Sequence, residues 1–429
     1  MRSRTGLVGL VILVLAATAA CDADKPTNTG APASTQAGHP ADHMATPTTL
    51  LPADASPEQV RGQFEQLLGH HALLAVRLMR AVVAGTPDLR QAAEASLQEN
   101  TDALTQLATV AYDDAQSQRF DQLWQRTVLD LTAYAEAVHA GDAAAKQQAR
   151  EDLLAEADAY ESWLAQASGG RVQPSTPSAM RTHVDNLMKQ LDAYAARDYA
   201  TAYRIERQDY EHLFGAGVTM AKGSVAPKAA AALDAPPEQL RSAFAMLLGE
   251  HMELIIAAQR ATFAGAPQFK AAAAQVNANS GALTKGMGAI VGPQKAAEFQ
   301  SAWAEHVEGL LAYSTAVADN DQAAKEAAKE NLNGIAGRLA LYLSDIVRNE
   351  LPVEPLTQAL GQHDTHLIGQ VDAYAAKQYG QADQMEGDGY QQMLGVAGTL
   401  VGAIQKTVKL QLPVGGSQTG LGGTAHRRR

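Results

Sequence analysis

Three histidines lie at inward-facing positions in the second half of the chain. His251 lies at the centre of a stripe of apolar residues spaced three and four apart, and His306 follows Trp303 on a second stripe. His363 lies on a third stripe, and Glu386 lies on the matching face of a fourth helical segment. This spacing places each side chain on the buried face of an amphipathic helix. Imidazole suits zinc, copper, iron and nickel. The sequence therefore predicts a transition-metal site, with copper or iron preferred to zinc.

The first half of the chain offers a smaller set of the same kind. His71, His183 and Glu206 occupy the equivalent positions, but Thr127 stands where the second half has His306. Because a threonine replaces the third imidazole, we expect metal binding in this half to be weaker or different.

Two other interpretations of these inward-facing residues are possible. A histidine on an apolar face is commonly a core residue whose ring nitrogens bind a carbonyl or carboxylate, which predicts a scaffold or binding module without metal. Alternatively, an open metal site could serve a redox enzyme. His363 and His366, one turn apart, also offer a surface chelate. No phosphate-binding glycine loop, CxxC pair, nucleophile-elbow serine or HExxH motif is present, so we predict no catalytic residue and favour a binding protein.

The metal-site residues lie within an internal repeat. Residues 57–71 and 237–251 share nine of fifteen amino acids, and residues 183–199 and 363–379 share nine of seventeen at the same offset of 180. The apolar spacing is that of helices throughout, without the alternation typical of strands. We therefore predict an all-α chain of two tandem homologous up-and-down bundles, at 57–222 and 237–411, each with four main helices and two shorter ones.

Glycine and proline breaks divide the first repeat into six helical segments. The segments are expected near 57–84, 88–111, 115–139, 142–167, 177–196 and 198–222. Residues 223–236 form the expected linker between the bundles.

The amino terminus has the features of an export signal. Arg2 and Arg4 precede an uncharged apolar run that ends at Cys21, the only cysteine of the chain. The run is too short for a transmembrane helix, so residues 1–20 are predicted to be a bacterial lipoprotein signal and Cys21 the lipidated anchor. The predicted location is the outer face of the cell membrane, with an envelope protein as a further possible partner.

The composition supports this placement. Residues 21–56 and 412–429 are rich in Pro, Thr, Ala and Gly and are predicted to be a disordered tether and tail. The net charge of -12 argues against a nucleic-acid partner and is compatible with cations.

The repeated motifs resemble those of a known group of proteins. The run Leu247–His251, the spacing from Trp303 to His306, and the block His363–Tyr379 are similar to secreted bacterial tandem-repeat helical lipoproteins. Some members of that group carry a copper amine oxidase label. That enzyme class makes its quinone from a tyrosine in an Asn-Tyr-acidic motif, and this sequence has no Asn-Tyr pair. The resemblance therefore implies the fold and export, and it implies no oxidase activity.

Overall fold

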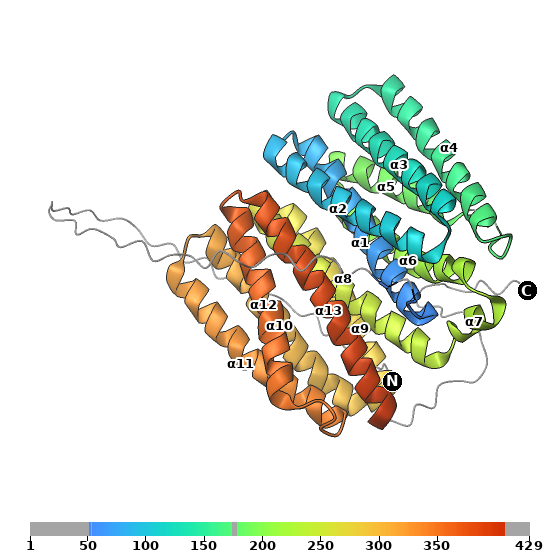
Figure 1. Ribbon diagram of the computed structural model, residues 1–429. Helices are drawn as coiled ribbons and strands as arrows, with labels where there is room; N and C mark the ends of the chain where they lie inside the picture. The colour runs from blue at the N-terminus through green and yellow to red at the C-terminus, as the bar shows by residue number, and fades with distance from the viewer. Residues whose placement is uncertain (1–50, 53, 174–177, 408–429) are drawn as a thin grey trace, which may run out of the picture. The chain divides into compact units, whose positions relative to one another are not determined.

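The structure, a computed structural model, describes residues 51, 52, 54–173 and 178–407. These residues form thirteen helices and no strand (Figure 1). The all-α helical-bundle fold predicted from the sequence is thus confirmed. The predicted signal, Cys21, nearly all of the tether and the tail lie outside the described residues.

Each repeat supplies six long helices in the same order. The first repeat contains α1 (Pro57–Ala84), α2 (Pro87–Ala111), α3 (Asp114–Ala140), α4 (Ala143–Ala167), α5 (Ala179–Ala195) and α6 (Tyr199–Ser224). The second contains α8 (Pro236–Ala264), α9 (Ala266–Val291), α10 (Pro293–Ala318), α11 (Gln322–Ile346), α12 (Val353–Ala375) and α13 (Tyr379–Thr407). A short helix, α7 (Pro227–Ala232), lies in the predicted linker. Within the repeats the helices are more equal in length than the expected four long and two short: of these twelve, only α5, with 17 residues, is much shorter than the others.

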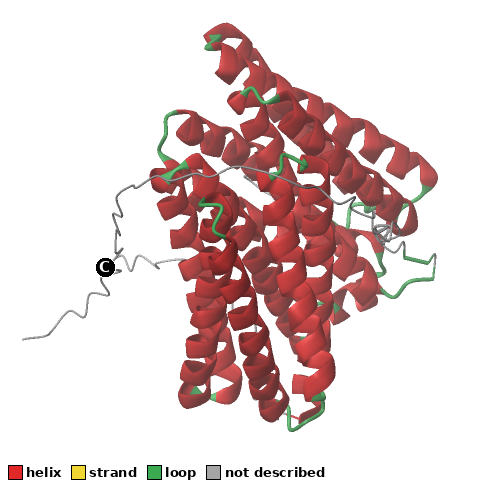
Figure 2. Cartoon of the chain, turned by 90° about the vertical axis from the view of Figure 1, so that its left-hand side faces the viewer, coloured by secondary structure: helices red, strands yellow, loops and turns green. Residues whose placement is uncertain are grey.

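Local chemistry sets the helix ends. The Ser56 hydroxyl accepts a hydrogen bond from the Gln59 backbone N–H, and the Gln59 side-chain oxygen accepts one from the Ser56 backbone N–H, so a capping box opens α1. Gly85 and Gly141 end α1 and α3 in the left-handed conformation, at φ of 65° and 67°. Figure 2 shows the resulting architecture, in which short loops join antiparallel neighbours.

The first helix of each repeat is its central element. Helix α1 packs against α2, α3, α5 and α6, and α8 packs in the same way against α9, α10, α12 and α13. Helix α1 is also long and apolar enough to cross a membrane, but 72% of its most apolar window is buried inside the protein. Its apolar character is therefore accounted for by its place in the core.

The two repeats share one interface. Helix α1 contacts α8, its own counterpart. Helix α2 contacts α13, and the counterparts of these two helices, α9 and α6, contact each other as well. Four apolar residues of the first repeat, Leu73, Tyr203, Tyr210 and Phe214, belong to the hydrophobic core of the second. The repeats therefore pack against each other through a common core, with the linker helix α7 beside α6.

Candidate metal centre

The structure brings three of the predicted residues together. His251 comes from α8, His306 from α10 and His363 from α12, and one nitrogen of each lies within 4.8 Å of the others. Their ring centroids are 5.6 to 5.8 Å apart. We call these residues the histidine trio. Their side chains are 0 to 3% exposed, so the trio lies in the core of the second repeat.

The nitrogens of the trio have few partners. Both ring nitrogens of His251 and both of His363 are buried without a hydrogen bond. Buried polar atoms normally have a partner, because leaving one unsatisfied costs about 1–3 kcal/mol. The usual account of a core histidine, a bond to a carbonyl or carboxylate, therefore does not describe these two residues.

A buried aspartate accompanies the third histidine. Asp364 Oδ1 lies 3.5 Å from His306 Nδ1, and the carboxyl group is 6% exposed. A carboxylate beside one nitrogen of an imidazole fixes its tautomer and leaves the other nitrogen free to bind a metal. Sequence reasoning missed Asp364, although it directly follows His363, because its helical position alone does not show that it reaches His306.

Burial sets the protonation of the group. It lowers the pKa of His251 and His363 well below 6.5, with added repulsion from neighbouring imidazoles, and lowers the pKa of His306 to about 4. Burial also raises the pKa of Asp364 to about 8. The imidazoles are consequently neutral near pH 7, and a neutral imidazole is the form that ligates a metal.

Glu386, the carboxylate predicted as the fourth ligand, lies elsewhere. It forms an ion pair with Arg77 from the first repeat, and its Oε2 lies 3.0 Å from Arg260 Nη2. It also shares a group with His70 and Glu253, in which one ligand atom of each lies within 4.8 Å of the others. Two guanidinium groups already neutralise these carboxylates, so this second group is best described as a buried ion-pair network between the repeats.

The first repeat assembles two of its predicted residues. The rings of His71 and His183 lie 5.5 Å apart, and Asp209 Oδ2 lies 2.8 Å from His183 Nδ1. Glu206 points to Arg80, with Oε2 2.8 Å from Nη2, and so repeats the position of Glu386. Thr127 donates its hydroxyl to the carbonyl of Leu123 and contributes nothing to the pair.

Asp209 is the second residue that sequence reasoning missed. It lies three positions after Glu206 on α6, a spacing that places both on one face and could have drawn attention to it. Its counterpart in the second repeat is Gly389, so comparing the two copies conceals it.

Of the remaining histidines, His366 and His212 lie outside both groups. His366 is not among the residues that converge on the trio. His212 places Nε2 2.9 Å from the carbonyl oxygen of Ala179, and its counterpart Gln392 donates to the equivalent carbonyl of Ala359. This histidine therefore has a structural partner.

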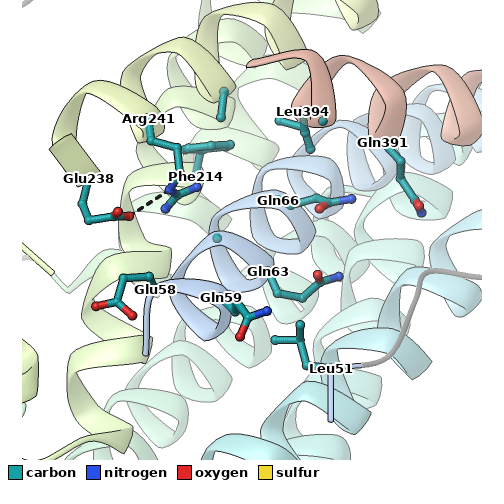
Figure 3. A pocket seen from close by; sticks show the side chains of 13 residues that line it. Leu51, Glu58, Gln59, Gln63, Gln66, Phe214, Glu238, Arg241, Gln391 and Leu394 are labelled. Atoms are coloured by element: carbon teal, nitrogen blue, oxygen red, sulfur yellow. Dashed lines mark hydrogen bonds and ion pairs between the residues drawn. The ribbon is translucent and has the colours of Figure 1, made fainter. Parts of the chain in front are cut away.

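Two hollows lie along the junction of the repeats, and neither is lined by the trio. One, of about 480 Å³, is bounded by Gln59 and Gln63 of α1 and by the Glu238–Arg241 ion pair of α8 (Figure 3). The other, of about 380 Å³, is lined by His70 and Asp383 among others. Access to the trio from either would require side chains to move.

Comparisons with protein-family models, curated proteins and solved structures found no match to this chain.

Proposed function

We propose that this protein binds a transition-metal ion, copper in its monovalent state first, at His251, His306 and His363. The observation that carries the proposal is the convergence of three buried imidazoles from three helices, with four of their six nitrogens unpartnered. Desolvating these atoms without partners opposes folding, and a bound metal ion would supply the missing interaction.

The donor set favours copper over iron. The carboxylate expected from Glu386 lies with Arg77 and Arg260, so the trio offers nitrogen ligands alone. Iron(II) sites of the common two-histidine type need a carboxylate ligand, whereas copper and zinc accept imidazoles. Zinc usually completes a tetrahedron with a fourth ligand.

Charge balance favours a monovalent ion. Asp364 is the carboxylate in ion-pair range of the trio, and a buried charge is stable only when it is paired. Near pH 7 the buried Asp364 carboxyl keeps its proton, because burial raises its pKa to about 8. Loss of that proton as the ion binds would supply one negative charge, which balances Cu(I), whereas Zn²⁺ would leave a net positive charge in the core unless hydroxide accompanied it. Deep burial also fits retention of a metal, for storage, delivery or sensing, better than turnover of a substrate.

The cellular setting of this proposal rests on the sequence. An acylated Cys21 would anchor the bundles outside the cell membrane, where they would hold copper in the envelope. Incorporation of labelled fatty acid into the wild type and its loss in Cys21→Ser would support that location. Equal labelling of both would contradict it.

The metal is tested by anaerobic Cu(I) titration of the full chain against a chromophoric chelator. His306→Thr installs the residue found in the first repeat. It should lower the Cu(I) affinity of the trio by more than the roughly 100-fold that loss of an orienting group causes. The matched control is His366→Gln, which changes a histidine outside the trio and should leave the affinity unchanged. Wild-type affinity in His306→Thr would refute the site and favour the scaffold reading.

A further inference from the structure

The first repeat contains a histidine pair with the same setting as the trio. His71 and His183 are separated by 5.5 Å between ring centroids, and their counterparts His251 and His363 by 5.8 Å. His71 packs on Trp124 with ring centroids 4.5 Å apart, as His251 packs on Trp303 at 4.4 Å. The position of two imidazoles against a tryptophan is thus common to both repeats.

Unpartnered nitrogens are present in this pair as well. His71 Nδ1 and His183 Nε2 are buried without a hydrogen bond, and the two side chains are 1% and 0% exposed. Asp209 accepts a hydrogen bond from His183 Nδ1, so the lone pair of His183 lies on Nε2. A buried lone pair with no donor is an acceptor for a cation.

Each repeat provides one buried aspartate to one histidine, but from a different helix. Asp209 of α6 accepts a hydrogen bond from His183, and the position equivalent to Asp209 in the second repeat is Gly389. Asp364 of α12 lies beside His306, and the position equivalent to Asp364 in the first repeat is Val184. Since the aspartates occupy different positions, the shared sequence does not explain why both repeats have one. A common requirement for one acidic side chain beside a histidine does.

The number of ligands separates the two repeats. Thr127 donates its hydroxyl to the carbonyl of Leu123, so the first repeat offers two imidazole nitrogens as metal ligands where the second offers three. Zinc requires about four ligands. Monovalent d¹⁰ ions such as Cu(I) and Ag(I) accept two nitrogen donors in line, and the single charge of Asp209 balances them.

We propose that His71 and His183 form a second metal site, with Asp209 as its counter-charge, which takes Cu(I) or Ag(I) and rejects Zn²⁺. The site extends the metal binding proposed for the second repeat, but it depends on separate residues. One chain would then hold two monovalent ions at two different coordination numbers.

The test is a calorimetric titration of the full chain with Ag(I), which needs no reductant, and separately with Zn²⁺, using Cys21→Ser as the wild-type background because a free thiol would itself bind Ag(I). Wild type should bind two equivalents of Ag(I). His183→Leu should lose one, and the double variant His251→Leu/His363→Leu, which leaves a single imidazole in the trio, should lose the other. His212→Gln is the matched control: it installs the glutamine of the second repeat, keeps the bond to the Ala179 carbonyl, and should retain both equivalents.

The outcomes distinguish the two proposals. A wild type that binds one equivalent, lost only in His251→Leu/His363→Leu, overturns the second site and supports the trio. A wild type that binds one equivalent, lost only in His183→Leu, overturns the trio and supports the second site. Zn²⁺ binding that is lost in His183→Leu also contradicts the second site.

A readout on the wild type covers the case in which His183→Leu does not fold. Nitrogen-15 spectra of the imidazoles should show the His71 and His183 resonances shifting as Ag(I) is added up to two equivalents. Resonances that stay unchanged up to that point refute the site.

Discussion

The hydroxyl groups of Tyr210 and Tyr390, the same position in the two repeats, lie 3.2 Å apart. Each hydroxyl also lies 3.2 Å from a main-chain carbonyl oxygen of the other repeat: Tyr210 from Met246 and Tyr390 from Gln66, which are again equivalent positions. A local twofold axis therefore passes between the tyrosines, and the repeats meet as two subunits do in an isologous dimer.

Removal of either hydroxyl should weaken this junction. Tyr210→Phe and Tyr390→Phe should each lower the free energy of unfolding by about 1 kcal/mol, because each loses hydrogen bonds in a buried setting. The double variant should cost less than the sum, since the two residues share one bond. Denaturant unfolding measures all three variants, and strictly additive losses would contradict the shared bond.

Gly249 is needed where α8 packs against the tyrosine pair. A Cβ at this position would lie 2.7 Å from Tyr210 Oη and 2.9 Å from Tyr390 Cε2. Gly249→Ala should therefore destabilise the protein by about 1–3 kcal/mol through overpacking. The control is Gly398→Ala on α13, where no atom lies within 4 Å, and which should stabilise by up to about 1 kcal/mol. Thermal unfolding that ranks them in the opposite order would refute the close approach.

Arg77 joins the repeats through charge. It reaches from α1 to Glu253 and Glu386 of the second repeat, whose side chains are 2% and 0% exposed. Arg77→Met should cost about 3–5 kcal/mol in unfolding free energy, because buried Glu253 loses its guanidinium partner while Glu386 keeps only Arg260. Arg90→Met, which breaks exposed ion pairs with Glu94 and Glu136, should cost about 1 kcal/mol or less. Equal losses of unfolding free energy in Arg77→Met and Arg90→Met would show that the ion pairs between the repeats are solvated.

His70 should make stability depend on pH. Burial, followed by the charge of Arg77, lowers its pKa to about 3, although Glu253 and Glu386 lie 4.0 and 3.8 Å away, because those carboxylates are paired with arginines. The unfolded chain takes up this proton near pH 6.5, so the contribution of His70 is full above 6.5 and is lost as the pH falls towards 3.

The dependence of the unfolding free energy on pH can test this role of His70. Within that window His70 accounts for up to about 1.4 kcal/mol per pH unit, and His70→Gln should remove up to that amount from the slope of unfolding free energy against pH. Wild-type and variant curves that stay parallel from pH 6.5 to 4 would show that His70 titrates normally. His139→Gln, an exposed histidine, serves as the control.

Asp364 should tune the metal affinity of the trio without being a ligand. Asp364→Asn removes the acidic group beside His306, so no negative charge can form there when the ion binds. We expect Cu(I) affinity to fall roughly 10–100-fold while the trio still binds its ion. Chelator competition measures the change, with Asp388→Asn, a half-buried carboxyl outside the trio, as the control. An affinity within twofold of wild type would remove Asp364 from the site.

Most of the helical architecture could be predicted from the sequence. The three- and four-residue spacing of apolar side chains indicated α1 at 57–84, and the structure places the helix at Pro57–Ala84. Such features are local, because a helix closes its hydrogen bonds within four residues and its caps within three. The inward faces of His251, His306 and His363 follow from the same periodicity.

The membership of the site could not be predicted in full. The sequence placed Glu386 on a buried face, yet the structure sets it against Arg77 and Arg260 rather than with the trio. Helical periodicity gives the angle of a side chain around the axis; it gives neither the height of one helix against another nor the partner across a domain junction.

The sequence by itself therefore determined the duplicated all-α fold, its helix boundaries and the buried faces that carry the histidines. Only the tertiary structure decided that Asp364 and Asp209 accompany those histidines, that Glu386 belongs to an ion-pair network, and that Tyr210 meets Tyr390 on a local axis. The physical reason is range: helices form from contacts a few residues apart, whereas these groups are assembled by packing between helices distant in the chain.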